Sequence, residues 1–414
     1  MIYACIRWWA IIFLRLYFRK TIVYGLENVP AKGPLIVASN HPSAFLEASL
    51  VATIMKRPVH FLVRGDMFHP RFRWLFNWTK QIPIYRKKDG ITNLRKNASS
   101  FDLTYRKLAQ GESVLIFPEA KTTLEKKMRP IQRGTAHLAF GTLPYLQPGQ
   151  SLMIQPVGVN YTEPRIPGTD VVVRFGQPFV SRHGEREDRD AIEDFTETLT
   201  EALSPLIIQV EDAGLHVYDV MAAIYFRMIF DNHNTADAHF HLKEIASLSS
   251  EESIITTKSH DVHQKLMKER LNEAVYFPDL VVLNKMGLGI MMLLKVIWLI
   301  GGGWIWRVVK TMIFKKISTD TFQSPTSIGV FMVVMPLMTF IILILLWAFG
   351  WPWYYALFWM AFMLMGTLIR PPLALIWKLF AMQGHIKNNL KSDIIEIRSG
   401  LESRLFTKKT DVFT

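Results

Sequence analysis

The segment Ser39-Asn40-His41-Pro42-Ser43-Ala44-Phe45-Leu46-Glu47 follows the apolar run Leu35-Ile36-Val37-Ala38. The run predicts a buried strand, and Pro42 predicts the start of a helix, where its missing N–H has no cost. His41 would then lie at the carboxyl end of a strand, the edge at which open α/β sheets bind ligands. Glu47 comes six residues after His41, so the two can pair only if His41 precedes the helix, as Pro42 indicates.

A carboxylate beside this histidine would fix the tautomer of the imidazole. It would also stabilise the imidazolium that forms when His41 takes a proton from a hydroxyl. The alternative is a strand-terminal histidine that caps a turn, with Glu47 on a solvated helix face. A pair of residues of this kind leaves both interpretations open.

The composition favours a protein that meets a membrane. The chain has 414 residues, half of them hydrophobic, and a formal net charge of +13. A basic balance is typical of proteins that bind nucleic acid, an anionic membrane surface or an anionic substrate. The positive charges lie among Trp, Phe and long apolar runs, which favours a membrane, and nucleic acid is not expected. Cys5 is the only cysteine, which excludes an intrachain disulfide framework and a cysteine metal site.

Strands alternate with helices over residues 21–210, which predicts an α/β domain with a mostly parallel sheet flanked by helices. If the strands are parallel, Glu119 and Lys121 follow a buried strand at the same edge as His41. His60 lies within an apolar run and is expected to be structural. The apolar runs that predict further strands are Val59–Val63, Ile82–Arg86, Val114–Phe117, Ile154–Val159 and Val171–Phe175.

Arg86 closes one of these strands and opens a basic triplet with Lys87 and Lys88. The planar fork of arginine matches phosphate oxygens, and lysine adds point charge. The triplet therefore predicts a phosphate-binding site, with a solvated charge cluster at the strand end as the alternative.

Four segments, in order, resemble the glycerolipid acyltransferase superfamily, which is typified by bacterial 1-acylglycerol-3-phosphate acyltransferases. The resemblance covers roughly the first half of the chain. It implies direct acyl transfer from acyl-CoA or acyl-carrier protein to a hydroxyl of 1-acylglycerol-3-phosphate in phospholipid biosynthesis. It implies no metal, no redox cofactor and no covalent acyl-enzyme. The segments are Asn40-His41…Glu47, Ile82-Pro83-Ile84-Tyr85-Arg86, Phe117-Pro118-Glu119 and Ile154-Gln155-Pro156-Val157.

The resemblance also implies roles for individual residues. His41 is expected to be the general base and Glu47 its orienting partner. Arg86 is expected to hold the phosphate of the acceptor, and Glu119 to shape the acceptor pocket. The residues expected to bind substrate are Arg86, Phe117, Pro118, Glu119 and Lys121.

The sequence departs from the family pattern at three places. The commonest first segment has Asp five residues after His, where this chain has Leu46, and the acid comes one residue later as Glu47. In the third segment Ala120 replaces the usual Gly, and Lys121-Thr122 replaces the usual Thr-Arg pair. Lys121 can supply the charge of the missing guanidinium but not its bidentate contact. The acceptor is therefore open. Glycerol-3-phosphate, another lipid acceptor and a non-catalytic lipid-binding scaffold are the alternatives.

The regions outside residues 21–210 predict membrane contact. Residues 1–20 are expected to form an interfacial helix with Trp8 and Trp9 at headgroup level, or alternatively to pack on the protein's own core. Residues 211–278 predict a polar helical linker. A metal site there, around His239 and His241, is disfavoured because the ligand spacing does not repeat.

Residues 279–414 are expected to be membrane-associated. The segment 330–349 has 20 uncharged residues, enough to cross a bilayer, and a second apolar run ends at residue 369. Together they predict a transmembrane helical hairpin at about 330–369, while 286–306 predicts an interfacial or re-entrant segment, with a full span as the alternative. Basic residues outside both open ends predict a multi-pass protein whose catalytic half lies at the cytoplasmic face of the inner or cell membrane. The expected partners are the lipid bilayer, the thioester donor and a phosphorylated glycerol acceptor.

Overall fold

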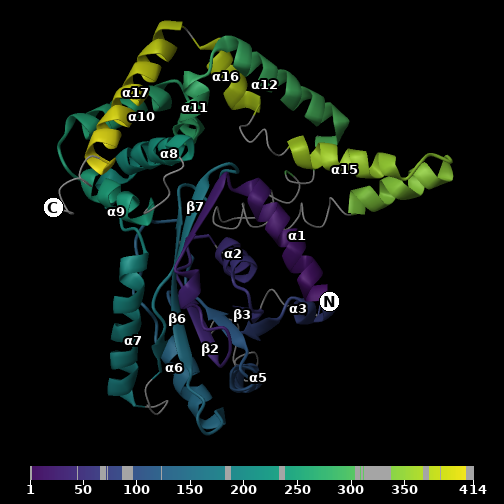
Figure 1. Cartoon of the computed structure of the whole chain (residues 1–414), viewed down its shortest axis with the longest axis vertical. Coiled ribbons are helices and arrows are strands. Elements are labelled where there is room, and N and C mark those ends of the chain that lie inside the picture. The colour runs from purple at the N-terminus through teal and green to yellow at the C-terminus, as the bar shows by residue number, and fades with distance from the viewer. Residues whose placement is uncertain are drawn as a thin grey trace. The chain divides into compact units, whose positions relative to one another are not determined.

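The structure of the chain is a computed structural model. It describes residues 2–43, 45–65, 71, 73–85, 97–122, 124–181, 188–232, 238–303, 308, 311, 337–366, 373–382 and 384–406. The contacts divide the chain, drawn in Figure 1, into two compact units. The first unit comprises Met1–Leu14, Val23–Asn160 and Val172–Ile207. The second comprises Arg15–Ile22, Tyr161–Val171 and Ile208–Thr414.

One mostly parallel sheet carries the candidate site, as the alternation of strands and helices predicts. Its strands follow the order β1-β7-β6-β2-β5-β3-β4, and β8 pairs with β6. The pairs β2·β5, β2·β6, β3·β5 and β3·β4 are parallel, whereas β6·β8 is antiparallel. The strands are β1 (Lys20–Tyr24), β2 (Leu35–Ser39), β3 (Val59–Arg64), β4 (Gln81–Ile84), β5 (Ser113–Ile116), β6 (Met153–Tyr161), β7 (Asp170–Phe175) and β8 (Phe179–Val180).

Strand β2 lies between β5 and β6, and every one of its residues is buried. An interior strand of a parallel sheet is covered on both faces, which is why its sequence is apolar without alternation. Near its end, Ala38 lies opposite Ile116 of β5 and Pro156 of β6. The chain therefore leaves β2 and β5 at the same edge of the sheet.

Helices of the first unit cover the sheet. Ile36 and Ala38 of β2 belong to a core that also takes Leu108 of α5, Leu138 of α6 and Leu199 of α7. Helix α5 ends where Gly111, at φ 79°, adopts the left-handed conformation, as its position in the sequence predicts. The helices are α1 (Ile2–Tyr17, which crosses into the second unit), α2 (Leu46–Ile54), α3 (Arg73–Trp78), α5 (Asn97–Ala109), α6 (Gly134–Thr142) and α7 (Arg189–Leu203).

The first part of helix α1 packs within the first unit through a partly buried arginine contact. Arg7 donates to the carbonyl oxygens of Ala52 (3.0 Å), Thr53 (2.8 Å) and Met55 (2.9 Å). These carbonyls lie in and just beyond the last turn of α2, where a helix leaves acceptors unpaired, so the guanidinium caps that helix. The alternative expectation for residues 1–20, packing on the protein's own core, thus holds for this face. Trp8 is 66% exposed, and its interfacial role stays a prediction.

The second unit is largely helical. Residues 211–278 differ from a solvated linker, because Met221, Tyr225 and Met228 of α8 are fully buried. Helices α8, α10 and α17 pack on one another, a contact between segments more than a hundred residues apart that local polarity does not reveal. The helices are α8 (Leu215–Asn232), α9 (Ala238–Leu248), α10 (Ile254–Lys268), α11 (Pro278–Val282), α12 (Lys285–Trp298), α15 (Tyr354–Gly366), α16 (Leu373–Ala381) and α17 (Gly384–Phe406).

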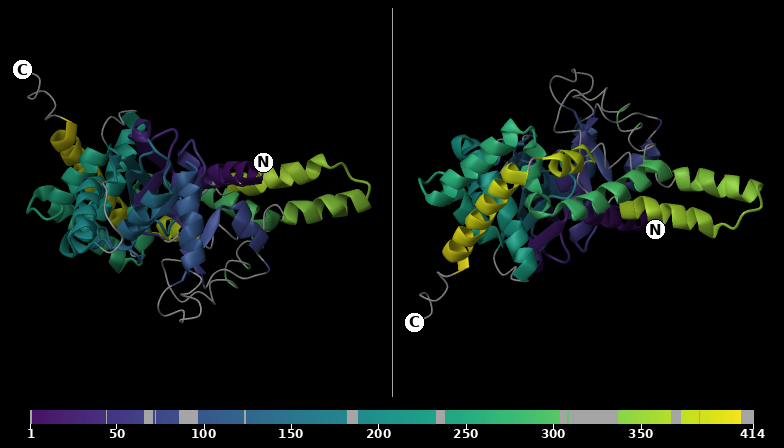
Figure 2. Two further views of the ribbon diagram at one scale, coloured as in Figure 1. Left: turned by 90° about the horizontal axis from the view of Figure 1, so that it is seen from below. Right: turned by 90° about the horizontal axis from the view of Figure 1, so that it is seen from above.

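Two helical segments form an antiparallel hairpin, drawn in yellow-green in Figure 2. Residues 337–348 are helical, and α15 returns after the turn. Gly350 has φ 67° and donates to Trp347 (3.1 Å), while Trp351 donates to Leu346 (2.8 Å), the Schellman pattern of a helix that ends at glycine. Residues 330–336 and 367–369 of the expected span lie outside the described residues. Within the described part, none of the helices combines the length and apolarity that a bilayer crossing requires.

Candidate active site

The two strand ends at the centre of the sheet bring His41 and Phe117 together. Their rings stack with centroids 3.9 Å apart and planes inclined by 11°. His41 follows β2 and Phe117 follows β5, so the parallel register that sets Ala38 opposite Ile116 also sets the two rings in contact. Phe117 thus covers one face of the imidazole.

Glu47 approaches His41 from the first turn of α2. Its Oε2 lies 3.7 Å from Nδ1 of His41. The Glu47 side chain is fully buried, whereas that of His41 is 16% exposed, which leaves the imidazole open to a small reactant. His41 and Glu47 therefore lie close together, as their spacing in the sequence allows. The catalytic roles of both residues stay predictions.

The helix starts later than Pro42 predicts. Helix α2 begins at Leu46, with Pro42 and Ser43 in a bend before it. The backbone N–H of Ser43 donates to Oε1 of Glu47, so the acid side chain holds the bend that separates His41 from the helix. A carboxylate in the first turn is also favoured by the positive end of the helix dipole.

The remaining oxygen of Glu47 is directed to the imidazole. Neither Oε2 of Glu47 nor Nδ1 of His41 has a hydrogen-bond partner in the described part of the chain. If the two side chains moved slightly closer, Nδ1–H of His41 would donate a hydrogen bond to Oε2 of Glu47. This bond would fix the tautomer that carries its proton on Nδ1. Nε2 is then the nitrogen that can take a proton from a hydroxyl.

Asn40 fixes the backbone beside His41, a role that the sequence alone did not assign. Its Nδ2 donates to the carbonyl of Val159 (2.9 Å), and the Val159 N–H donates to its Oδ1 (2.8 Å). The Asn40 residue is buried at the end of β2, and Val159 lies in β6. The position of Asn40 next to His41 was the available signal, but its partner is 119 residues away.

The segment after Phe117 turns Glu119 inward and Lys121 outward. Pro118 and Glu119 are buried, whereas Lys121 is exposed. Burial raises the pKa of the Glu119 carboxyl, and hydrogen bonds from the backbones of Arg129 and His41 oppose that rise. Glu119 therefore lies against the His41 backbone, and its role in the acceptor pocket stays a prediction; the described geometry does not bring Lys121 into the site.

The tight turn at this point has an unusual residue. Ala120 adopts φ 56°, a left-handed conformation that glycine takes without strain. Its N–H donates to the carbonyl of Phe117 at 3.1 Å. The place at which the sequence departs from the family's usual glycine is thus the place at which the backbone favours glycine.

Arg86 lies outside the described residues, so its proposed contact with phosphate stays a prediction. Strand β4 ends at Ile84, two residues earlier, and runs parallel to β3. Asn97 holds the next residue, Tyr85, by hydrogen bonds to its N–H (2.8 Å) and its carbonyl (2.7 Å).

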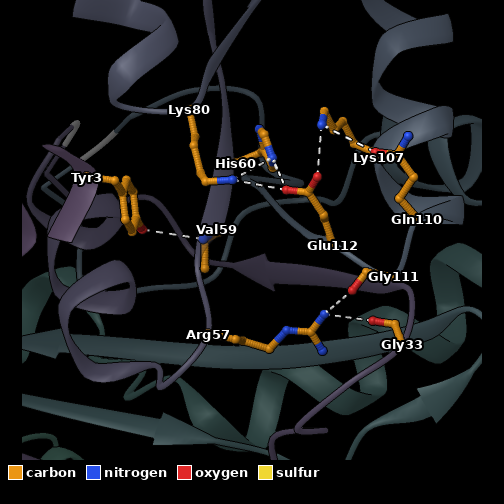
Figure 3. Close-up of polar contacts among 10 residues, drawn as sticks. All are labelled: Tyr3, Gly33, Arg57, Val59, His60, Lys80, Lys107, Gln110, Gly111 and Glu112. Carbon is orange, nitrogen blue, oxygen red and sulfur yellow. Dashed lines mark hydrogen bonds and ion pairs between the residues drawn. The ribbon is translucent and has the colours of Figure 1, made fainter. Parts of the chain in front are cut away.

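His60 belongs to a charge network at the amino end of the strands, away from the His41 edge (Figure 3). Glu112 contacts His60 Nε2 (2.6 Å), Lys80 Nζ (3.0 Å) and Lys107 Nζ (2.9 Å). Burial alone would raise the pKa of Glu112, but hydrogen bonds from Lys107, His60 and Lys80 outweigh it and lower the pKa to about 2. Burial lowers the pKa of His60, so its Nε2–H donates as a neutral imidazole. The contacts agree with the structural role expected for His60.

Within the described residues, no group of His, Cys, Asp or Glu side chains is arranged to hold a metal ion. His241, one of the residues weighed for a metal site, instead contacts the hydroxyl of Tyr225 through Nδ1 at 2.8 Å in the buried core.

Residues 20–160 match the acyltransferase family. An uncharacterized acyltransferase of Schizosaccharomyces pombe is 23% identical over 51% of this chain and 45% of that protein. A 1-acyl-sn-glycerol-3-phosphate acyltransferase of Bacillus subtilis is 28% identical over 28% of this chain and 55% of that protein. Glycerol-3-phosphate O-acyltransferase 1 of Saccharomyces cerevisiae is 26% identical over 26% of this chain and 15% of that protein. The chain thus spans about half or less of the length of these relatives.

Among solved structures, the 1-acyl-sn-glycerophosphate acyltransferase PlsC from Thermotoga maritima is 20% identical, covering 46% of this chain and 73% of that chain with a TM-score of 0.33. The family match contains the segments from β1 to β6, and with them His41, Glu47 and Glu119. Residues 20–160, about one third of the chain, are thus similar to the acyltransferase family.

Proposed function

We propose that the protein transfers a fatty acyl group from acyl-CoA or acyl-carrier protein to the free hydroxyl of 1-acylglycerol-3-phosphate. The observation that carries the proposal is the buried Glu47 carboxylate 3.7 Å from the imidazole of His41, at the ligand-binding edge of a parallel sheet and within the family segment.

The geometry supports a direct transfer. Nε2 of His41 accepts the proton of the acceptor hydroxyl, and the hydroxyl oxygen attacks the thioester carbonyl carbon. The C–S bond then breaks, and the imidazolium returns its proton to the leaving thiolate. Glu47 stabilises the imidazolium, and the stacked Phe117 ring adds a favourable cation–π contact while it excludes water from one face.

Arg86 is proposed to bind the phosphate of the acceptor, with Phe117, Pro118 and Glu119 forming the wall of the acceptor pocket. Lys121 is exposed, and a bound phosphate would have to draw its side chain toward the site. Glycerol-3-phosphate is the second candidate acceptor. The His-to-Glu spacing, one residue longer than in the commonest first segment, resembles that of some glycerol-3-phosphate acyltransferases and favours it.

The test is acyl transfer by membranes that contain the full chain. Radiolabelled glycerol-3-phosphate and 1-acylglycerol-3-phosphate are each supplied with acyl-CoA and, in parallel, with acyl-carrier protein. His41→Ala should abolish labelled product, whereas His385→Ala, an exposed histidine on α17, should leave it unchanged. Equal product from wild type and His41→Ala would refute the assigned base, and the labelled acceptor identifies the substrate.

Arg86→Ala separately tests whether Arg86 binds the phosphate of the acceptor. The substitution should raise KM for a phosphorylated acceptor about tenfold or more and leave KM for the thioester donor unchanged. An unchanged KM for both acceptors would show that Arg86 does not bind phosphate.

The hairpin at about 330–369 is proposed to insert into the membrane, with the catalytic unit at its cytoplasmic face. Trp347, Phe349, Trp351 and Trp353 near the turn are 60–83% exposed, as aromatic side chains at a distal interface would be. With Cys5 replaced by serine, a cysteine at Trp351 should react with an impermeant maleimide only from the non-cytoplasmic side of sealed vesicles. Labelling from the cytoplasmic side would show that the hairpin does not cross.

A further inference from the structure

We propose that a pocket among α8, α11 and α17 binds a single-chain lipid with a phosphate monoester head. This pocket shares no residue with the His41 site. Figure 1 shows the three helices together in the helical second unit, and all of the lining residues belong to that unit. The cavity has a volume of about 480 Å³, within the usual range for small-molecule sites.

The floor of the pocket is apolar. Ile224 of α8 and Ile394 of α17 are buried in it, and Leu283 lines it after the end of α11. At the mouth, Val282 is 38% exposed and Ile395 is 51% exposed. Large aliphatic side chains that face water beside a preformed apolar cavity are stabilised when a hydrocarbon chain covers them.

The rim of the pocket is basic. Arg227, Lys391 and Arg398 line it, and among the described residues Asp279 is the one acidic residue of the lining. Lys391, Ile394, Ile395 and Arg398 have the i, i+3, i+4, i+7 spacing of one helix face, so α17 presents both the apolar surface and its cationic ends.

Acidic groups only partly compensate this charge. Arg227 pairs with Asp279 at 2.9 Å, and Arg398 pairs with Glu402 at 3.2 Å. The carboxylates of both pairs are well exposed, so each pair is weak and can yield to a ligand. Lys391 forms no ion pair within the described part of the chain.

The positive charge extends past the rim. Lys387 donates to the carbonyl of Leu283, a pocket residue, at 2.6 Å. Burial lowers the pKa of Lys387, and the charges of Lys285 and Lys391 lower it further. An anion bound at the rim would relieve this repulsion.

Size and charge together specify the ligand class. Arg227, Lys391 and Arg398 in the lining, with Lys387 beside it, form a basic rim that suits the charge of a phosphate monoester. The cavity volume of about 480 Å³ is that of a site for one small molecule. A single acyl chain is therefore the proposed apolar part of the ligand.

The test measures ligand binding with a fluorescent label placed beside the pocket. In a Cys5→Ser background, Ser392→Cys is labelled with bimane, because Ser392 is exposed one turn before Ile395 on α17. The full-length protein in detergent is titrated with three probes: 1-dodecanoylglycerol-3-phosphate, the neutral 1-dodecanoylglycerol, and glycerol-3-phosphate. The first should give a saturable emission shift. The neutral lipid should bind at least tenfold more weakly, and glycerol-3-phosphate should give no shift.

Variants separate this site from the candidate active site. Val282→Trp at the mouth should abolish the shift, and Lys391→Glu should weaken binding about tenfold by removing an attraction and adding a repulsion. Lys268→Glu makes the same charge change on α10, outside the pocket, and should change affinity less than twofold. The shift should persist in His41→Ala, since the pocket contains no residue of that site.

Three outcomes would overturn the proposal. One is a shift of equal affinity for the neutral and the phosphorylated lipid. Another is an affinity that Lys391→Glu and Val282→Trp leave unchanged. The third is a response to anionic vesicles but not to the monomeric lipid, which would assign this surface to a membrane.

Discussion

The substitution Glu47→Gln tests whether the buried carboxylate acts through His41. It removes the charge and keeps the shape of the side chain, and the amide oxygen can still accept the Ser43 N–H. At 3.7 Å, the carboxylate and an imidazolium attract each other by about 4 kcal/mol at an effective dielectric constant of 20. Because 1.4 kcal/mol corresponds to tenfold in rate, kcat should fall by about 10² to 10³.

The assay is release of the free thiol from acyl-CoA in the presence of acceptor. The exposed Cys5 adds a constant background, which Cys5→Ser removes. KM for both substrates should change little, because Glu47 is fully buried and stabilises the charge that develops during transfer. Thermal unfolding of the variant should occur at or near the temperature of the wild type.

The double variant His41→Ala/Glu47→Gln tests whether the two residues act together. His41→Ala already removes the imidazolium that Glu47 stabilises, so adding Glu47→Gln should cost no further activity. If the two losses multiply, Glu47 acts independently of His41, and the pairing drawn from the structure is wrong. A rise in KM with unchanged kcat would likewise refute a role in the chemical step.

Glu112 has a lower pKa in the folded protein, about 2, than the unfolded value of 4.5, so the unfolded state binds more protons as the pH falls between these values. The stabilisation by Glu112 is complete above pH 4.5 and is lost toward pH 2. After solvent screening it amounts to about 1 kcal/mol. In Glu112→Gln, the midpoint of urea denaturation should depend less on pH over that range. The lowered pKa of His60 adds a loss of stability below its ordinary pKa of 6.5, which His60→Gln should remove. Ala120→Gly should stabilise the fold by up to about 1 kcal/mol and Ala120→Val should destabilise it, because φ is 56° there; calorimetry that ranked them in reverse would contradict the strain. Asn40→Ala leaves both backbone groups of Val159 unpaired in the core and should cost about 3 kcal/mol, with kcat falling in the variant that still folds; an unchanged denaturation midpoint would rule this out.

The central part of the sheet could be derived from the sequence because its signals are local. The uninterrupted apolar run of β2 is typical of a strand inside a parallel sheet, and Pro42 indicates that His41 precedes the following helix. Parallel strands then end at one edge whatever the details of packing. The convergence of His41, Glu47 and the Phe117 segment is therefore implied by spacing and strand direction.

Two expectations differ from the structure, because side-chain and tertiary contacts decide them. Whether residues 211–278 are solvated depends on what packs against them, and α8 is covered by α10 and by α17 from the far end of the chain. Helix α2 begins at Leu46 rather than at Pro42, and the Glu47 side chain accepts from the Ser43 N–H in the bend before it. The hydrophobic periodicity of the sequence shows neither effect.

The sequence by itself determined the mostly parallel sheet and the edge at which His41 lies, because both follow from local pattern and strand direction; it allowed the pairing of His41 with Glu47 without deciding it. Only the tertiary structure decided that Asn40 is held by Val159, 119 residues away, and that Glu112 is surrounded by His60 and two lysines. The same holds for the cationic pocket on α17. Those features depend on side chains from elements distant in the sequence, whose contact is fixed only when the whole core is packed.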